Sequence, residues 1–448
     1  MFRIDKTFYR TLVVIAVPII LQNLMQSFIN MLDTIMVGQL GAVEIAAVGL
    51  GNQIFFMLNM ILFGISSGGA IFIAQYWGKK DVAGIRRTLG IALSFASVVA
   101  ALFTAAALAA PEFLIGLYSK DPAVVKAGGA YLRVVACSYP MMAVSFVYSQ
   151  AFRSTEHVKL PMIATIASLV ANGLLNYVFI FGAGPVPAMG VVGAAAATVI
   201  SRALELAVLL VTAYRKKYEA AARPKELFSY GTAFVAKYVK IAFPVILNET
   251  FWGLGITVQN AIFARAGTDA IAAFNITGTI SQLTWVFFIG VGNAAAIIIG
   301  KKIGASDRTE AYRYANKFAV FMPIMSVFIG VWLIPLSKAL PLFFKVDPEI
   351  IMQAARMLLV MMCTYPFKSF NMCMIVGICR SGGDTVFAAI CDILFMWTIA
   401  LPLGAVAALV LHAEPWAVYI CILSEEIFKS SAGFVRLKSK KWLHDVTV

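Results

Sequence analysis

A single carboxylate interrupts the first long apolar stretch of the chain, residues 10–37. There Asp33 follows Gln22, Gln26 and Asn30 at i, i+4, i+8 and i+11, so a helix would carry all four side chains on one face. Lipid cannot solvate such a face, and a carboxylate in hydrocarbon costs at least about 2.5–3.5 kcal/mol. The face therefore points into a bundle or into water, where it binds a cation or joins helices through hydrogen bonds.

A second polar face follows in the apolar stretch 158–183. Thr165, Ser168, Asn172 and Asn176 recur at i, i+3, i+7 and i+11. Amide and hydroxyl oxygens, in combination with a carboxylate, are ligands that suit a hard monovalent cation. The same groups could instead keep the Asp33 carboxyl protonatable, because desolvation disfavours its charged form. The residue types alone do not distinguish H⁺ from Na⁺ as the coupling ion.

The second half of the chain carries an acid beside an aromatic side chain. Glu249 lies next to Asn248 and near Trp252 in the stretch 236–264. This combination suits an amphipathic organic cation, through charge attraction and cation–π contact, although helix packing is the alternative reading. The predicted cargo-contacting residues are Glu249, Trp252, Asn248, Gln282, Tyr139 and Tyr365.

The remaining polar and sulfur-containing residues do not indicate a catalytic site. Arg202 and Glu205 are three residues apart and predict a local ion pair, and the role of Asp392 stays open. The six cysteines lie in apolar runs, and the histidines lie near span ends or in the tail. No phosphate-binding loop or catalytic triad is evident. We therefore expect no enzyme activity and no cofactor, and a gradient of H⁺ or Na⁺ as the energy source.

The elements that position these residues are membrane-spanning helices. The 448 residues are 61% hydrophobic and 13% charged, far more apolar than a soluble domain. Stretches long enough to cross about 30 Å of hydrocarbon recur along the chain, which predicts an all-α polytopic fold. The twelve predicted spans are 10–37, 45–75, 85–110, 123–151, 158–183, 189–214, 236–264, 270–300, 311–339, 348–378, 385–411 and 415–435.

The net charge of +14 reflects the orientation of the chain in the membrane and does not indicate a nucleic-acid partner. Most of the 36 Lys and Arg residues, Arg153, Arg380 and Lys429 among them, fall in segments that lie on one side of the membrane if both termini lie on that side. By the positive-inside rule this side is the cytoplasm. We expect a multi-pass protein of the cytoplasmic (inner) membrane, in contact with lipid, monomeric, and with both termini inside.

The same landmarks recur at a constant offset of 226 residues. Pro18 matches Pro244, and the shift also carries Gly41 onto Gly267. Further pairs in register are Asp81 with Asp307, Asp121-Pro122 with Asp347-Pro348, and Tyr139-Pro140 with Tyr365-Pro366. An even number of spans in each half makes the halves parallel repeats, with a cleft that opens alternately to the two sides. The predicted domains are an N-lobe at 1–214, a cytoplasmic linker at 215–235 and a C-lobe at 236–448.

The chain resembles the multidrug and toxic compound extrusion (MATE) family. The resemblance rests on Pro18, on the segments Leu32-Asp33-Thr34 and Val37-Gly38-Gln39-Leu40-Gly41, on Asn172 to Gly182, on Gly190 to Ala195 and on Lys440-Lys441-Trp442. It implies a two-lobed antiporter that exchanges H⁺ or Na⁺ for small amphipathic, cationic organic molecules.

The resemblance also implies a cation site in the N-lobe. In the DinF-like branch of the family, the matching positions are Asp33, Asn172, Asn176 and Thr198, which makes these four the candidate Na⁺ ligands. The family pattern has Asp where this chain has Asn176, and one fewer carboxylate weakens a Na⁺ site. NorM-like members carry an acid on span ten, where this chain has Ser369.

Three alternatives compete with antiport. A lipid-linked oligosaccharide flippase of related architecture should have a cationic cleft, whereas the acids of the predicted spans match or outnumber the basic residues there. A membrane enzyme would need a catalytic cluster. A channel fits two repeated lobes less well than alternating access does.

Overall fold

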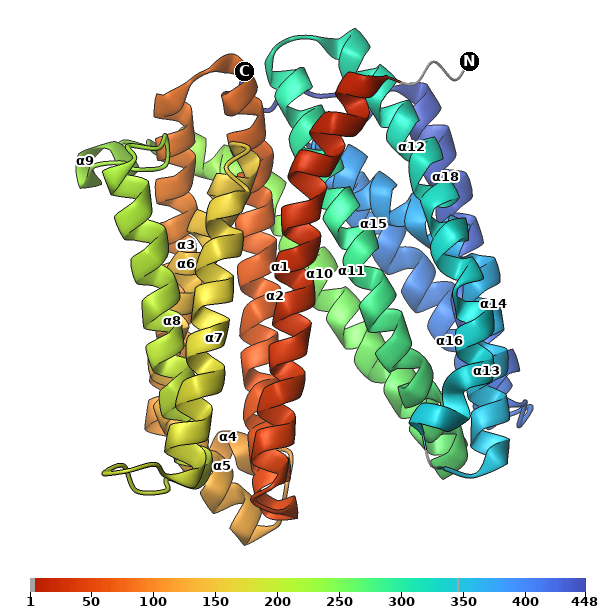
Figure 1. Cartoon of the computed structure of the whole chain (residues 1–448). Coiled ribbons are helices and arrows are strands. Elements are labelled where there is room, and N and C mark those ends of the chain that lie inside the picture. The colour runs from red at the N-terminus through yellow and green to blue at the C-terminus, as the bar shows by residue number, and fades with distance from the viewer. Residues whose placement is uncertain (1–4, 345) are drawn as a thin grey trace. The chain divides into compact units, whose positions relative to one another are not determined.

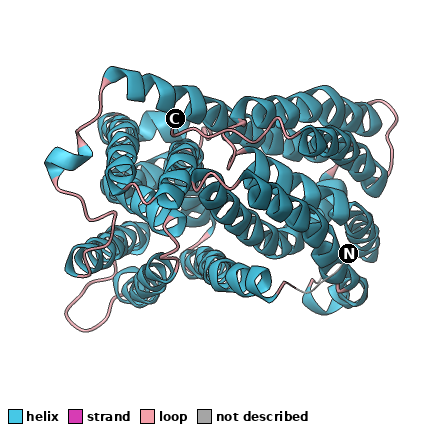
Figure 2. Cartoon of the chain, turned by 90° about the horizontal axis from the view of Figure 1, so that it is seen from above, coloured by secondary structure: helices cyan, strands magenta, loops and turns pink. Residues whose placement is uncertain are grey.

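The computed structural model describes residues 5–344 and 346–448, with the side chains of Ile29, Asn30 and Phe343 outside the description. The described part is helical and contains no named strand, in agreement with the all-α prediction (Figure 1, Figure 2). The first nine helical elements are α1 (Lys6–Gly38), α2 (Ala42–Lys79), α3 (Val82–Ala109), α4 (Pro111–Gly116), α5 (Pro122–Val135), the short η1 (Ala136–Ser138), α6 (Tyr139–Ser154), α7 (Lys159–Phe181) and α8 (Gly190–Arg215).

The second half of the chain repeats this order of long helices after the short α9 (Pro224–Leu227). The later elements are α10 (Thr232–Ala266), α11 (Thr268–Gly304), α12 (Arg308–Val331), α13 (Leu333–Phe343), α14 (Pro348–Met372), η2 (Cys373–Cys379), α15 (Thr385–Phe395), η3 (Met396–Ala400), α16 (Leu401–Leu409), α17 (Pro415–Leu423) and α18 (Glu425–Ser439).

Within the described residues, eleven helical stretches are long and apolar enough to cross a membrane. The twelfth predicted span, 415–435, corresponds to α17 followed by α18. Ser424, the residue between them, keeps right-handed helical dihedrals of φ −59° and ψ −28°. The two helices therefore continue one another with a local slip in the hydrogen-bond ladder, which is consistent with twelve spans.

Several of the repeated sequence landmarks lie at helix starts. Asp81 caps α3 by accepting a hydrogen bond from the Gly84 amide at 2.9 Å, and Asp307 caps α12 by accepting from the Glu310 amide at 3.1 Å. Asp121 and Asp347 cap α5 and α14 in the same way, each before a proline at the first helical position.

Gly41 and Gly267 precede α2 and α11, both with a φ of 141°. A residue with a Cβ atom would be strained at this dihedral. The repeat therefore preserves the local chemistry that starts each pair of helices.

The structure divides into two compact units. The N-unit is Val17–Ala242, and the C-unit is Phe243–Val448 together with Met1–Ala16. The divisions fall inside α1 and α10, again 226 residues apart, and each precedes a proline inside the helix, Pro18 or Pro244. The predicted lobe boundaries, 1–214 and 236–448 with a linker at 215–235, stay a prediction.

The first turns of α1 are held within the C-unit. The ring of Phe8 packs against Tyr314 and Phe318 of α12, with ring centroids 5.4 and 4.9 Å apart. Lys317 donates to the Asp5 carboxylate at 2.5 Å, and Arg313 lies 3.4 Å from the same oxygen. These contacts, chiefly the hydrogen bond from Lys317, hold the pKa of Asp5 below its usual value.

Asp5→Asn is expected to cause a small loss of thermal stability at neutral pH. Because the folded protein lowers the pKa of Asp5, the ion pair stabilises the fold above the unfolded-state pKa of about 3.9 and is lost as the pH falls below it. Thermal unfolding of the wild type and the variant in detergent, followed from neutral pH to below pH ~4, measures this. A stability difference that stays constant over that range would contradict the assignment.

The first turns of α10 are held within the N-unit in the equivalent way. Tyr238 donates its hydroxyl to the Ile65 carbonyl at 2.7 Å. Its ring stacks on Phe72 and Phe95, with centroid distances of 6.0 Å in both cases. Each repeat thus begins with a helix whose first turns belong to one unit and whose remainder belongs to the other.

Candidate functional site

The carboxylate of Asp33 meets the polar face of α7 inside the N-unit. Asn176 donates its amide to Asp33 and, at 3.2 Å, to the side-chain oxygen of Asn172. Asn172 and Asn176 are 4% and 1% exposed. The amide oxygen of Asn176 is buried and accepts no hydrogen bond, so it is an unsatisfied acceptor beside a carboxylate.

Three of the four predicted cation ligands therefore lie together, and the fourth has a separate partner. Thr198, on α8, donates its hydroxyl to the Ala194 carbonyl of its own helix at 3.0 Å. The side chain of Asn30, predicted on the same face of α1 as Asp33, lies outside the described residues. Asp33, Asn172 and Asn176 together provide one carboxylate and two amide groups, which can hold a proton or a small monovalent cation.

Of the other described members of the two polar faces, Gln22, Thr165 and Ser168 are buried and Gln26 is half-buried. Thr165 and Ser168 are 2% and 3% exposed, and Ser168 donates to the Ser201 carbonyl at 2.8 Å. Gln22 donates to the Thr165 hydroxyl at 2.8 Å, which in turn donates to Glu205 at 2.9 Å. The polar face of α1 is therefore bound to α7 and α8 through a chain of hydrogen bonds.

The predicted local ion pair between Arg202 and Glu205 is confirmed, with a distance of 2.7 Å. Sequence reasoning missed Arg153, which it counted as a cytoplasmic residue. Its guanidinium donates to the Gln22 side-chain oxygen at 2.6 Å. Arg153 occupies the last turn of α6, from which a long side chain can reach back along the bundle.

In the C-unit, Glu249 is neutralised by a partner that the sequence did not reveal. Arg380 donates to its carboxylate at 2.5 Å, and the two side chains are 4% and 14% exposed, respectively. The sequence places Arg380 between two predicted spans, and the structure does have it in the turn between η2 and α15; its burial is what the sequence did not indicate. An isolated acid in an apolar stretch was the available signal, since a buried charge requires a partner.

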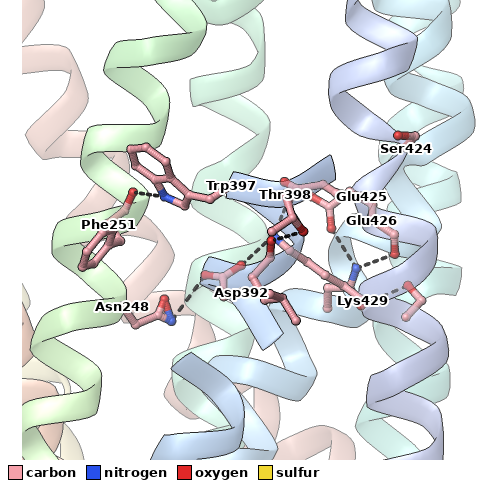
Figure 3. A network of polar contacts seen from close by, with 12 residues as sticks. Asn248, Phe251, Asp392, Trp397, Thr398, Ser424, Glu425, Glu426 and Lys429 are labelled. Atoms are coloured by element: carbon pink, nitrogen blue, oxygen red, sulfur yellow. Dashed lines mark hydrogen bonds and ion pairs between the residues drawn. The ribbon is translucent and has the colours of Figure 1, made fainter. Parts of the chain in front are cut away.

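Asp392, whose role the sequence left open, lies in a network with Asn248 and Lys429 (Figure 3). Asn248 donates to one carboxylate oxygen of Asp392 at 3.3 Å, and Lys429 donates to the other at 2.6 Å. Lys429 also lies 3.1 Å from Glu425 on its own helix. Lys429 was counted among the cytoplasmic residues, yet its side chain is 4% exposed.

The other predicted cargo contacts are divided between buried and accessible positions. Trp252 is half-buried and Gln282 is exposed. Tyr139 and Tyr365 are both buried; Tyr365 shares a hydrogen bond with Thr284, whereas the Tyr139 hydroxyl has no hydrogen-bond partner. In the described part, no hydrogen bond or ion pair joins these four residues to Glu249.

Full-length relatives support a transport function. The chain is 25% identical to "Uncharacterized transporter YisQ" of Bacillus subtilis over 98% of this chain and 96% of the relative. It is 24% identical to "Probable multidrug resistance protein NorM" of Thermotoga maritima over 97% of this chain and 93% of that protein. Together with the helices of spanning length, these matches define a multi-pass membrane protein of a bacterial transporter family.

The profile of the MatE family matches residues 18–178 and again residues 244–406. The chain belongs to this family, and the two matches begin 226 residues apart, as the repeat does. A solved structure described as "Crystal structure of MATE in the bent conformation" has the same fold, with a TM-score of 0.87 at 18% identity and coverage of 97% of this chain and 95% of the other.

Proposed function

We propose that the protein exports small amphipathic organic cations in exchange for H⁺ or Na⁺, by alternating access and without a cofactor. The observation that carries the proposal is the group formed by the half-buried Asp33 with the buried Asn172 and Asn176. A carboxylate with a hydrogen-bond donor on one side and an unsatisfied amide oxygen beside it can bind and release a cation. Thr198 is the fourth member of the proposed cation site.

Transport into proteoliposomes tests this directly. A fluorescent organic cation such as ethidium is supplied with an imposed pH gradient, an imposed Na⁺ gradient or neither. Movement against the ethidium gradient under either driving force, and its absence when both are collapsed, is the expected result. Movement that continues without any imposed gradient and only down the ethidium gradient would indicate a channel instead.

Asn176→Asp is expected to shift the coupling toward Na⁺. The variant adds a second carboxylate beside Asp33, and carboxylate number tunes the affinity of oxygen-ligand sites for metal cations. Ethidium transport under a Na⁺ gradient should rise relative to transport under a pH gradient. Asn172→Asp, one helical turn away on the same face, is the matched control for added charge, and an equal shift in both variants would show that position is irrelevant.

The proposed cargo site lies in the C-lobe around Glu249, Asn248, Trp252, Gln282 and Tyr365. Tyr139 is proposed as a separate cargo contact of the N-lobe. An acid beside an indole ring attracts a cation and packs against its apolar part. Cargo has to compete with Arg380 for Glu249, since the guanidinium neutralises it in this structure. Such competition would make cargo binding dependent on conformation.

A lipid-linked oligosaccharide flippase is the second candidate. Arg380 and Lys429, both buried in the C-unit, are the observation in its favour, because the sequence did not indicate that these two basic side chains lie in its interior. Each, however, contacts a carboxylate at 2.5 or 2.6 Å. Neutralised cations attract a pyrophosphate weakly, and this favours organic-cation export.

We propose the cytoplasmic membrane as the location, with a monomeric chain and both termini inside. Cysteines introduced at Ser229 and Ser439, both exposed, should react with an impermeant maleimide only after the cells are opened. The background lacks the six native cysteines, two of which are exposed. Lys120→Cys, in a predicted outer loop, is the positive control. Labelling of Ser229→Cys or Ser439→Cys in intact cells would reverse the orientation.

A further inference from the structure

A charged cluster lies within the C-unit and adjoins the proposed cargo site through Asn248. It consists of Asp392 on α15 with Glu425, Glu426 and Lys429 on α18 (Figure 3). Lys429 lies between two carboxylates, 2.6 Å from Asp392 and 3.1 Å from Glu425. The four side chains are buried to different degrees, with Glu425 and Lys429 5% and 4% exposed. We call this group the Lys429 cluster.

The three acids of the Lys429 cluster differ in their hydrogen bonds. Asp392 accepts from Lys429 and from Asn248. Glu426 accepts from the side-chain amide of Asn371 at 2.7 Å. For Glu425, the buried Oε2 forms an ion pair with Lys429 at 3.1 Å, but it shares this ammonium with Asp392 and accepts no hydrogen bond of standard geometry. Glu425 is therefore the least well stabilised carboxylate of the three.

The neighbouring elements add one more cation. On α14, Lys368 is close enough for its charge to act on Glu425 and Glu426, and its ammonium lies 5.0 Å from the Trp285 ring centre. The Arg380 and Glu249 pair lies near Asp392 and is neutral in itself. The segments η2, η3 and α17 carry no charged residues; Cys391 faces Glu425, and Tyr419 of α17 faces Glu426.

Charge balance then requires one further positive charge. Asp392, Glu425 and Glu426 carry three negative charges when ionised, against the two positive charges of Lys429 and Lys368. An unbalanced buried charge costs several kcal/mol, so the cluster gains by binding one cation. A metal ion has no place between Asp392 and Glu425, because the Lys429 ammonium occupies it. A proton on a carboxylate needs no such space.

We propose that Glu425 binds and releases a proton during transport, which gives the C-unit a proton site of its own besides Asp33. The proposal rests on the antiport function above. When Glu425 is protonated, Lys429 keeps Asp392 as its ionised partner; when the proton leaves, the ammonium is shared between the two. Asn248 connects Asp392 to α10, the helix whose first turns belong to the N-unit. Protonation can thereby change how α10 is held.

The test reads the proton directly, without cargo or gradient. Infrared spectra of the reconstituted protein are recorded at neutral and alkaline pH, and the band of protonated carboxyl groups is compared between variants. Glu425→Gln should remove one component of this band. Glu205→Gln, a buried glutamate of the N-unit already neutralised by Arg202, is the matched control and should leave the component in place.

Lys429→Met provides a second variant that does not depend on Glu425→Gln folding well. Loss of the ammonium leaves the cluster with one more uncompensated charge, so the protonated-carboxyl band should gain intensity. A band that is unchanged in both Glu425→Gln and Lys429→Met would overturn the proposal. Because no transport is measured, this result would stand apart from any failure of the antiport function.

A link to transport is tested with tetraphenylphosphonium as the probe cation. Binding of the probe to the detergent-solubilised protein should release one proton fewer in Glu425→Gln than in the wild type. Asp33→Asn should lower the release independently, and the double variant should lower it by both amounts. Equal proton release by the wild type and Glu425→Gln would exclude a role for this proton in the cycle.

Discussion

Asp33→Asn is expected to abolish gradient-driven export while leaving cargo binding measurable. The amide has nearly the volume of the carboxylate and can still bond with Asn176, so the N-unit should keep its packing. What the variant loses is the ability to alternate between a charged and a neutral side chain. It therefore stays in the equivalent of the cation-bound state, and cargo binding no longer responds to the coupling ion.

The measurement combines transport and binding on the same preparation. Ethidium export is followed in proteoliposomes under the gradient that drives the wild type, and ethidium binding is measured in detergent at several pH values and Na⁺ concentrations. Asp33→Glu, which keeps a titratable group but moves it by one methylene, is the control and should retain part of the export. Export at the normal rate in Asp33→Asn would remove Asp33 as the coupling residue.

Breaking the pair between Glu249 and Arg380 is expected to have the second large effect. Glu249→Gln leaves a buried guanidinium without its counter-charge, and such losses cost about 3–5 kcal/mol. Arg380→Gln leaves the carboxylate unpaired and should cost a similar amount. In the double variant neither charge remains, so most of the stability should return. Thermal unfolding of the four proteins in one detergent measures this coupling.

The same four proteins separate cargo recognition from stability. If Glu249 attracts the cargo, the stable double variant should bind cationic cargo less well than the wild type while binding a neutral analogue equally well. An equal loss for both cargoes would assign Glu249 a packing role. Arg380→Gln gives the converse test, because freeing Glu249 from its competitor should strengthen the binding of cations in molecules that remain folded.

Several features of this protein follow from the sequence because they depend on local chemistry. The helical period predicts one polar face with Gln22 and Asp33 and a second from Thr165 to Asn176. The structure places the described members of both faces inside one unit. Asp81 and Asp307 could be recognised as equivalent because each caps a helix through neighbouring backbone amides. The length of the apolar stretches likewise determines helices of spanning length.

The partners of the buried charges were decided by the tertiary structure. Glu249 and Arg380 are 131 residues apart, and Asn248 and Asp392 are 144 apart, so no local pattern connects them. Position along the chain also gave no sign that Arg153, Arg380 and Lys429 have partners within the helical units, namely Gln22, Glu249 and Asp392. Long basic side chains can reach polar groups on other helices, and the free energy of an unpaired charge, which depends on every element around it, favours such pairs.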